Sequence, residues 1–258
     1  MGKSGNKWKE KLGAIGTIFK NGILVNKRLF LKLAIIVLSI VAMTLGLIYI
    51  NLSYVNDITG YVNGHAYVDL GLSVKWATCN VGATTPAEYG DYFAWGETTT
   101  KTDYSWDTYK YCKGTDTTIT KYCYDSWYGN YRFADNKTTL DSKDDAATVN
   151  WGGSWRMPTD DELIELRKQC KWRWTTHNGE NGYKVTGPNG NSIFLPAAGY
   201  MYGNALCYAG LYGHYWSSSL DAGSPGNAYD VYFRSDYVGW DYHNYYRFYG
   251  FAVRPVCQ

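Results

Sequence analysis

An uncharged apolar run of eighteen residues, 33–50, constrains the fold of this chain more than any other sequence feature. A helix that crosses a bilayer needs ~20 apolar residues. Leu29, Phe30 and Leu31 extend the run, and the Lys32 ammonium can reach back to the membrane interface. The sequence therefore predicts a single transmembrane helix over residues 33–50, with the lipid bilayer as a partner of this segment.

The charges on either side of this run predict its orientation. Residues 1–32 carry eight basic residues and one acid, a net charge of +7, whereas the remaining 17 basic and 22 acidic residues give −5. Because positive segments stay on the cytoplasmic side, residues 1–32 are expected to be a basic cytoplasmic tail. The tail either lies on the inner membrane surface or is a disordered basic flank. A cleaved signal peptide is the alternative, but no A-x-A site follows the run.

The segment after the apolar run reads as a stalk followed by one domain. Residues 51–64 have few large apolar clusters and are expected to be the stalk. Residues 65–258 have a uniform composition, rich in Gly and Tyr, with short apolar alternations broken by turns. Their length is within the usual range of a single domain.

One helix is predicted within this domain, over residues 160–170. Thr159 is a suitable N-cap, and Glu162 three residues later completes a capping box. Leu163 and Leu166 then share one face, which predicts that the helix packs on a sheet.

Strands are predicted from short alternations. Residues 183–186 and 192–195 flank a turn sequence at 187–190 and predict a hairpin. Residues 229–234 have a period of two, which predicts a buried face and a polar face, formed respectively by Tyr229, Val231 and Phe233 and by Asp230, Tyr232 and Arg234. Residues 97–150 are dense in Thr, Asp, Tyr and Lys and suggest an elaborated surface insertion.

Six ordered segments resemble a known family: YVDLGLSVKWATCNVGA, YGDYFAWGE, WRMPTDDELIEL, GYKVTGPNGNSIFLPAAG, YWSSS and FAVRPV. They are similar to the Fibrobacter succinogenes major paralogous domain, a bacterial group related to the C-type-lectin and sulfatase-modifying-factor fold. The resemblance implies an α+β, C-type-lectin-like domain over residues 65–258, with short strands, one clear helix and long loops, preceded by the single transmembrane helix. It also implies that residues 67–77 pair with residues 251–256. The expected localisation is a bacterial membrane, with the domain extracytoplasmic.

Residues 205–249 are also similar to the variable proteins of diversity-generating retroelements, which use the same fold. Replacement of adenines in Asn-type codons in those systems never produces Lys, Glu, Gln or Met. None of these four residues occurs between Tyr202 and Val256. This absence fits a diversified cassette, although a tyrosine-rich loop of another origin has the same composition.

Ten tyrosines lie between residues 208 and 249. Tyrosine offers a large contact area with only two side-chain torsions to fix, and for that reason binding loops favour it. The predicted ligand-binding residues are Tyr232, Arg234, Asp236, Tyr237, Asp241, Tyr242, His243, Tyr245, Tyr246, Phe248 and Tyr249. Arg247 and Arg254 are expected to be structural and to pair with nearby carboxylates.

The sequence favours neither catalysis nor a cofactor. The four histidines are scattered, without an H-E-x-x-H pattern, and the six cysteines contain no C-x-x-C pair, so no catalytic residue and no metal site is predicted. A calcium-dependent sugar site is disfavoured because no Trp-Asn-Asp motif is present. No nucleic-acid partner is expected.

The predicted function is therefore that of a membrane-anchored extracytoplasmic binding module with an unknown protein or glycan ligand. A structural or adhesin-type envelope protein is the first alternative. An enzyme of the formylglycine-generating type, which shares the fold of the resemblance, is a remote one, because the cysteine arrangement of that family is absent.

Overall fold

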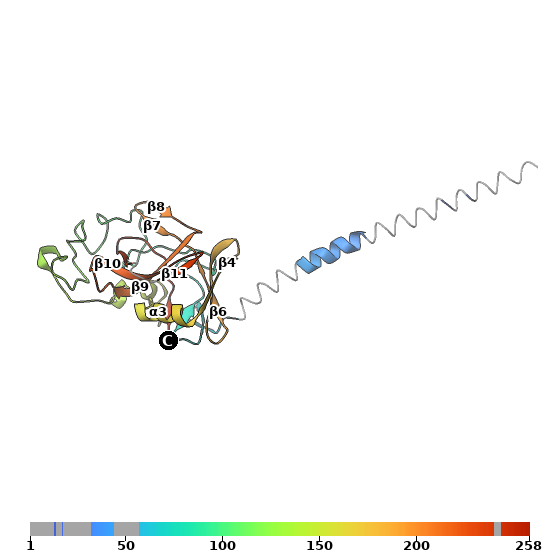
Figure 1. Cartoon of the computed structure of the whole chain (residues 1–258), viewed down its shortest axis with the longest axis horizontal. Helices are drawn as coiled ribbons and strands as arrows, with labels where there is room; N and C mark the ends of the chain where they lie inside the picture. Colours follow the sequence, from blue (N-terminus) through green and yellow to red (C-terminus); the bar gives the residue numbers. More distant parts are fainter. Residues whose placement is uncertain (1–12, 14–16, 18–31, 44–56, 240–243) are drawn as a thin grey trace, which may run out of the picture. The chain divides into compact units, whose positions relative to one another are not determined.

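The computed structural model describes residues 13, 17, 32–43, 57–239 and 244–258 (Figure 1). The chain divides into two compact units, Met1–Asn56 and Asp57–Gln258. Most of the predicted basic tail and residues 44–56 lie outside the described residues.

The prediction of a transmembrane helix over residues 33–50 is wrong. Among the described residues, no helix is both long enough and apolar enough to cross a bilayer. Residues 32–43 are helical. Residues 44–50 lie outside the described part. The same finding contradicts the expected single-pass membrane localisation.

The second unit is mostly β, so the expectation of an α+β fold is also wrong. Its first sheet is antiparallel, in the order β1 (Gly60–Val62), β2 (His65–Val68), β3 (Lys75–Ala77) and β13 (Val256–Cys257). Val256 pairs with Trp76, which confirms the expected pairing of the two ends of the domain. Strand β1 falls within the range expected to be a stalk.

The second sheet is a meander of β4 (Lys171–His177), β5 (Glu180–Thr186) and β6 (Ser192–Pro196). The predicted hairpin is confirmed. In its turn, the amide N–H of Gly190 donates to the carbonyl of Gly187 at 3.0 Å, and Gly190 has a φ of +93°, which glycine adopts without steric cost. Pro196 ends the edge strand β6, where no ladder donor is lost.

The third sheet is built around β10 (Asn227–Arg234). It pairs with β9 (Tyr212–Leu220) on one side and with β11 (Tyr237–Gly239) and β12 (Asn244–Tyr246) on the other. A short hairpin, β7 (Tyr200–Tyr202) and β8 (Ala205–Cys207), precedes it. These six strands carry most of the C-terminal tyrosines.

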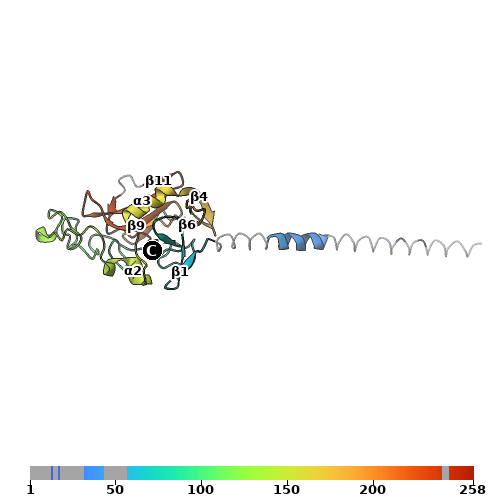
Figure 2. The same ribbon diagram turned by 90° about the horizontal axis from the view of Figure 1, so that it is seen from below.

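The predicted helix is confirmed as α3 (Asp160–Gln169), with the capping box between Thr159 and Glu162 formed in full. It packs against β9 and β10 through buried Leu163 and Leu166 (Figure 1). The shorter α2 (Ala146–Trp151) lies with β1 on the opposite side of the domain (Figure 2). Two 3-10 turns, Asn130–Arg132 and Ser142–Asp144, complete the helical elements of the described residues.

Substituting Thr159→Ala is expected to lower the free energy of unfolding by about 1 kcal/mol, because the N–H of Glu162 loses its side-chain acceptor. Urea denaturation of the full chain measures this change. Exposed Thr176 serves as the control, and Thr176→Ala is expected to change stability by less than about 0.5 kcal/mol. An equal loss in both variants would contradict the role of the cap.

Residues 97–150 contribute buried side chains to the core, which contradicts the expectation of a surface insertion. Tyr104, Tyr109 and Tyr122 are buried in one of the two hydrophobic clusters. Their hydroxyls donate to buried acceptors; for example, Tyr109 donates to the Trp95 carbonyl at 2.7 Å. A tyrosine can be buried at little cost when its hydroxyl is paired in this way.

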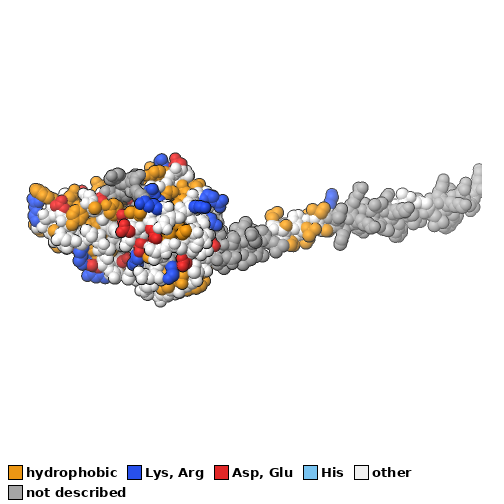
Figure 3. Space-filling model, turned by 60° about the horizontal axis from the view of Figure 1, so that its bottom comes forward, with side chains coloured by type: hydrophobic (Ala, Val, Ile, Leu, Met, Phe, Trp, Pro, Cys, Tyr) orange, Lys and Arg blue, Asp and Glu red, His pale blue; other side chains and the backbone are white. Residues whose placement is uncertain are grey.

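Charged side chains of both signs are interspersed over the face drawn in Figure 3. Unlike these surface charges, the side chains of Arg247 and Arg254 are buried. They are structural, as expected, but both donate hydrogen bonds to backbone carbonyls, and Arg254 also donates to Asn80, rather than to carboxylates.

Candidate functional site

A continuous series of aromatic rings runs across the β7–β8 hairpin, β9, β10 and the end of the chain. We call it the tyrosine ladder. Each ring lies within about 6 Å of the next, centroid to centroid, in the order Tyr237, Tyr232, Tyr212, Tyr208, Tyr200, Tyr249, Phe248 and Tyr246, and Tyr202 stacks on Tyr249.

The outer rings of the ladder are half exposed. Tyr202 is 54% exposed, Tyr208 51% and Tyr246 45%. Their faces are nevertheless fixed by neighbours: Tyr208 stacks on Tyr212 at 4.6 Å, and Tyr202 stacks on Tyr249 at 5.3 Å. Rings that are both exposed and fixed can contact a ligand with little further loss of side-chain entropy.

A buried polar pair lies beneath the ladder. The Nδ1 of His214 is 2.9 Å from a carboxyl oxygen of Asp230, and both side chains are fully buried. The His214 ring stacks on Tyr232 at 4.8 Å and meets the ring of Tyr245 edge-on at 4.8 Å. Burial raises the pKa of Asp230 well above its usual range. The buried His214 ring thus packs against one ring of the ladder, that of Tyr232.

The prediction that one face of β10 is polar and exposed is wrong at two of the three positions. Asp230 is 4% exposed and Tyr232 is 8% exposed; Arg234 alone is exposed. The alternation fails because both faces of this central strand are covered: α3 packs on the strand, and the His214 ring covers Tyr232.

The other predicted binding residues are divided between surface and interior. Arg234 and Asp236 form an exposed ion pair at 2.9 Å beside half-buried Tyr237, at one end of the ladder. At the other end Tyr246 is exposed, Tyr245 and Tyr249 are half buried, and Phe248 is buried. Asp241, Tyr242 and His243 lie outside the described residues.

Sequence reasoning missed the half of the ladder that precedes β10, namely Tyr200, Tyr202, Tyr208 and Tyr212. Tyr200 and Tyr202 occupy alternate positions of a short strand, and this period of two was the available signal. No local pattern shows that this hairpin lies beside residues 248–249; that proximity is set by the tertiary fold, in which Met201 bridges to Gly250.

A pocket of about 290 Å³ opens at the C-terminal end of the ladder, lined by Asn227, Tyr245, Tyr246 and Tyr249. The rings of Tyr245 and Tyr249 stand at 86° to each other with centroids 5.7 Å apart, so they form a corner. Burial raises the pKa of Tyr245 and of Tyr249. Their phenols are therefore neutral at physiological pH. We call this the tyrosine pocket.

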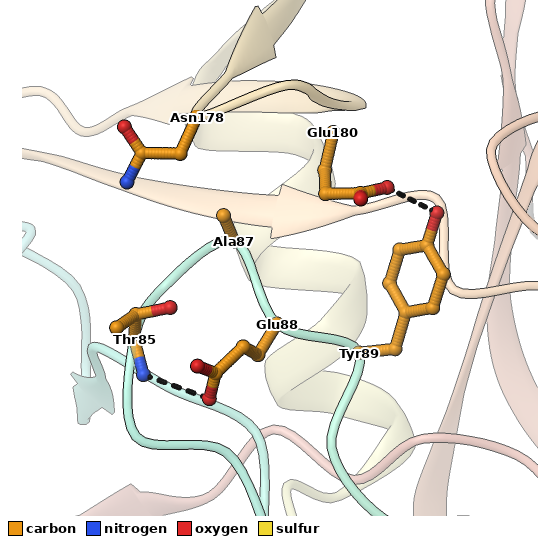
Figure 4. A pocket seen from close by; sticks show the side chains of 6 residues that line it. All are labelled: Thr85, Ala87, Glu88, Tyr89, Asn178 and Glu180. Carbon is orange, nitrogen blue, oxygen red and sulfur yellow. Dashed lines mark hydrogen bonds between the residues drawn. The ribbon is translucent and has the colours of Figure 1, made fainter.

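A second pocket, of about 400 Å³, lies between the loop at residues 85–89 and the β4–β5 turn (Figure 4). Its two carboxylates are already engaged within the protein. Glu88 accepts hydrogen bonds from Thr84 and Thr85, and Glu180 accepts one from the Tyr89 hydroxyl at 2.5 Å.

The six cysteines, all within the described ranges, are free thiols, and four of them are buried. Burial raises the pKa of Cys170 to about 11, and burial also raises the pKa of Cys257. A raised pKa keeps a thiol in its unreactive protonated form. Among the described residues, no group of His, Cys, Asp and Glu side chains is arranged to hold a metal ion.

Comparison with known proteins gives one match. Residues 169–256, about a third of the chain, match the model of a family described as Domain of unknown function (DUF8237). No curated protein and no solved structure matches the chain. The matched range begins just before β4 and includes every residue of the tyrosine ladder, so this part of the chain is similar to that family.

Proposed function

We propose that residues 57–258 form a ligand-recognition module whose binding surface is the tyrosine ladder. The observation that carries this proposal is the combination of exposure and fixed orientation in the outer rings, Tyr202, Tyr208 and Tyr246. Rigid aromatic side chains of this kind dominate the energetics of many binding surfaces. The ligand is a protein or a glycan that brings apolar faces to the rings and polar groups to the phenols.

We further propose that the domain is related to the Fibrobacter succinogenes major paralogous domain and to retroelement variable proteins. Two features support this relation. The strands at the two ends of the domain pair with each other, and the exposed rings of the ladder lie at residues 202–246, which nearly coincide with the range similar to a variable cassette.

The proposal predicts that Tyr202→Ala combined with Tyr208→Ala weakens ligand binding by at least about tenfold, because each lost ring removes ~1 kcal/mol or more. Arrays of glycans and of proteins, probed with the full chain and with this double variant, measure the change. Thermal unfolding shows first that the variant is folded.

The matched control removes two tyrosines that are exposed elsewhere, Tyr61 (67%) and Tyr131 (97%). Tyr61→Ala with Tyr131→Ala is expected to leave array binding unchanged. If the control loses binding as much as the ladder variant does, or if the ladder variant keeps full binding, the proposal is wrong.

A further inference from the structure

Two lysine ammonium groups of this domain lie over pairs of tyrosine rings. The Lys121 ammonium lies over the rings of Tyr122 (4.5 Å) and Tyr111 (5.5 Å), and it donates to Asp141 at 2.8 Å. A cation over a tyrosine face is attracted by the quadrupole of the ring.

The Lys101 ammonium has the same kind of surroundings. It lies 5.5 Å from the ring centroid of Tyr104 and 5.7 Å from that of Tyr109, and it donates to Glu97 at 3.0 Å. Each of these internal sites thus consists of two tyrosine rings and at least one carboxylate.

The tyrosine pocket offers tyrosine rings to a group from outside, without the carboxylate of the two internal lysine sites. Three tyrosines line it, with Tyr245 and Tyr249 nearly perpendicular. The fourth lining residue, Asn227, is neutral. None of the described lining residues carries a positive charge that would repel a cation.

We propose that the tyrosine pocket binds an alkylammonium group, as carried by a lysine side chain of a protein ligand. The ammonium would lie against the rings of Tyr245, Tyr246 and Tyr249. This inference rests on the proposed recognition surface and assigns the chemistry of its ligand at one end of the ladder.

The experiment titrates the full chain with three small probes and follows ligand signals by NMR. The probes are N-acetyl-lysine amide, N-acetyl-norleucine amide, which has a methyl group where lysine has its ammonium, and N-acetyl-trimethyllysine amide, which keeps the charge but has no N–H donor. Lysine is expected to bind roughly 3- to 30-fold more tightly than norleucine, the range for a cation held over tyrosine faces.

Variants test which pocket residues supply this preference. Tyr246→Leu and Tyr249→Leu are expected to abolish the preference for lysine over norleucine, whereas Tyr246→Phe, which keeps the ring, retains it. Trimethyllysine, which keeps the positive charge, is also expected to bind more tightly than norleucine. The matched control Tyr131→Leu removes an exposed tyrosine of the loop at residues 126–133 and is expected to change nothing.

Equal binding of lysine and norleucine, or no measurable binding of either, would overturn the inference. A panel of neutral methyl glycosides is titrated in parallel. Binding of a glycoside that is lost in Tyr249→Leu, without any preference for lysine, would also overturn the ammonium assignment. In either case the proposed function is judged separately, by whether the Tyr202 and Tyr208 double variant loses binding on the arrays.

Discussion

Replacing Arg254 by Met is expected to lower the free energy of unfolding by about 3–5 kcal/mol, the largest effect that we predict for a single substitution. The guanidinium is 1% exposed. It donates to the carbonyls of Ala77 (3.0 Å), Thr78 (2.7 Å) and Phe194 (3.0 Å) and to Asn80 Oδ1 (2.8 Å).

The location of these acceptors explains the size of the effect. Ala77 ends β3 and Phe194 lies in β6, so Arg254 joins the first sheet to the second. Burial lowers the pKa of Arg254 because it removes water from around the charge. Methionine would fill part of the volume but would leave four buried acceptors without a donor, and each such acceptor costs about 1–3 kcal/mol.

Urea denaturation of the full chain, followed by near-UV circular dichroism, measures this loss. Arg173 is exposed on β4 and provides the control: Arg173→Met is expected to change stability by less than about 0.5 kcal/mol. A loss of less than about 1 kcal/mol in Arg254→Met would contradict the structural role given to Arg254.

The substitution Asp144→Asn is expected to cost about 2–3 kcal/mol at pH 7, the second-largest effect, because hydrogen bonds to a charged group are stronger than neutral ones. The Asp144 carboxylate is 3% exposed and accepts hydrogen bonds from Tyr111 (2.5 Å), Tyr122 (2.7 Å) and the Lys121 ammonium. These bonds hold together the tyrosine-rich segment that sequence reasoning placed on the surface.

The contribution of Asp144 to the free energy of unfolding is expected to fall as the pH is lowered. Burial by itself opposes ionisation of Asp144, but the hydrogen bonds from Lys121, Tyr111 and Tyr122 outweigh it and lower the pKa to about 2. An unfolded Asp has a pKa of about 3.9. The contribution of Asp144 to stability is therefore complete above about pH 5 and is lost as the pH falls through about 2.

The measurement is the difference in unfolding free energy between the native chain and Asp144→Asn at a series of pH values from 7 to 2. This difference is expected to stay constant down to about pH 5 and then to shrink. Asp107→Asn, at an exposed position, is the control and is expected to show no such trend. A difference that grows on acidification would contradict the assigned hydrogen-bond network.

Local signals in the sequence predicted the elements that depend on neighbouring residues. Helix α3 was predicted from its capping box, and the β5–β6 hairpin from the turn between its strands. The transmembrane prediction for residues 33–50 rested on apolar composition alone, and among the described residues no helix is both long enough and apolar enough to cross a bilayer.

Which tyrosines are buried and which are exposed could not be predicted from the sequence. Tyr202 is exposed and Tyr122 is fully buried, and both lie in segments rich in tyrosine and glycine or threonine. A buried tyrosine needs a distant carbonyl or carboxylate that accepts a hydrogen bond from its hydroxyl, as Asp144 accepts one from Tyr122. The same reason explains why only part of the ladder was predicted: its members are joined by tertiary contacts.

The most direct test of the ladder as the binding surface is hydroxyl-radical footprinting of the full chain, with and without the tightest ligand found on the arrays. The ladder as binding surface predicts that the ligand protects Tyr202, Tyr208 and Tyr246 from oxidation, while Tyr61 and Tyr131 are oxidised as in the free protein. Protection of Tyr61 or Tyr131, with the three ladder tyrosines unchanged, would contradict it.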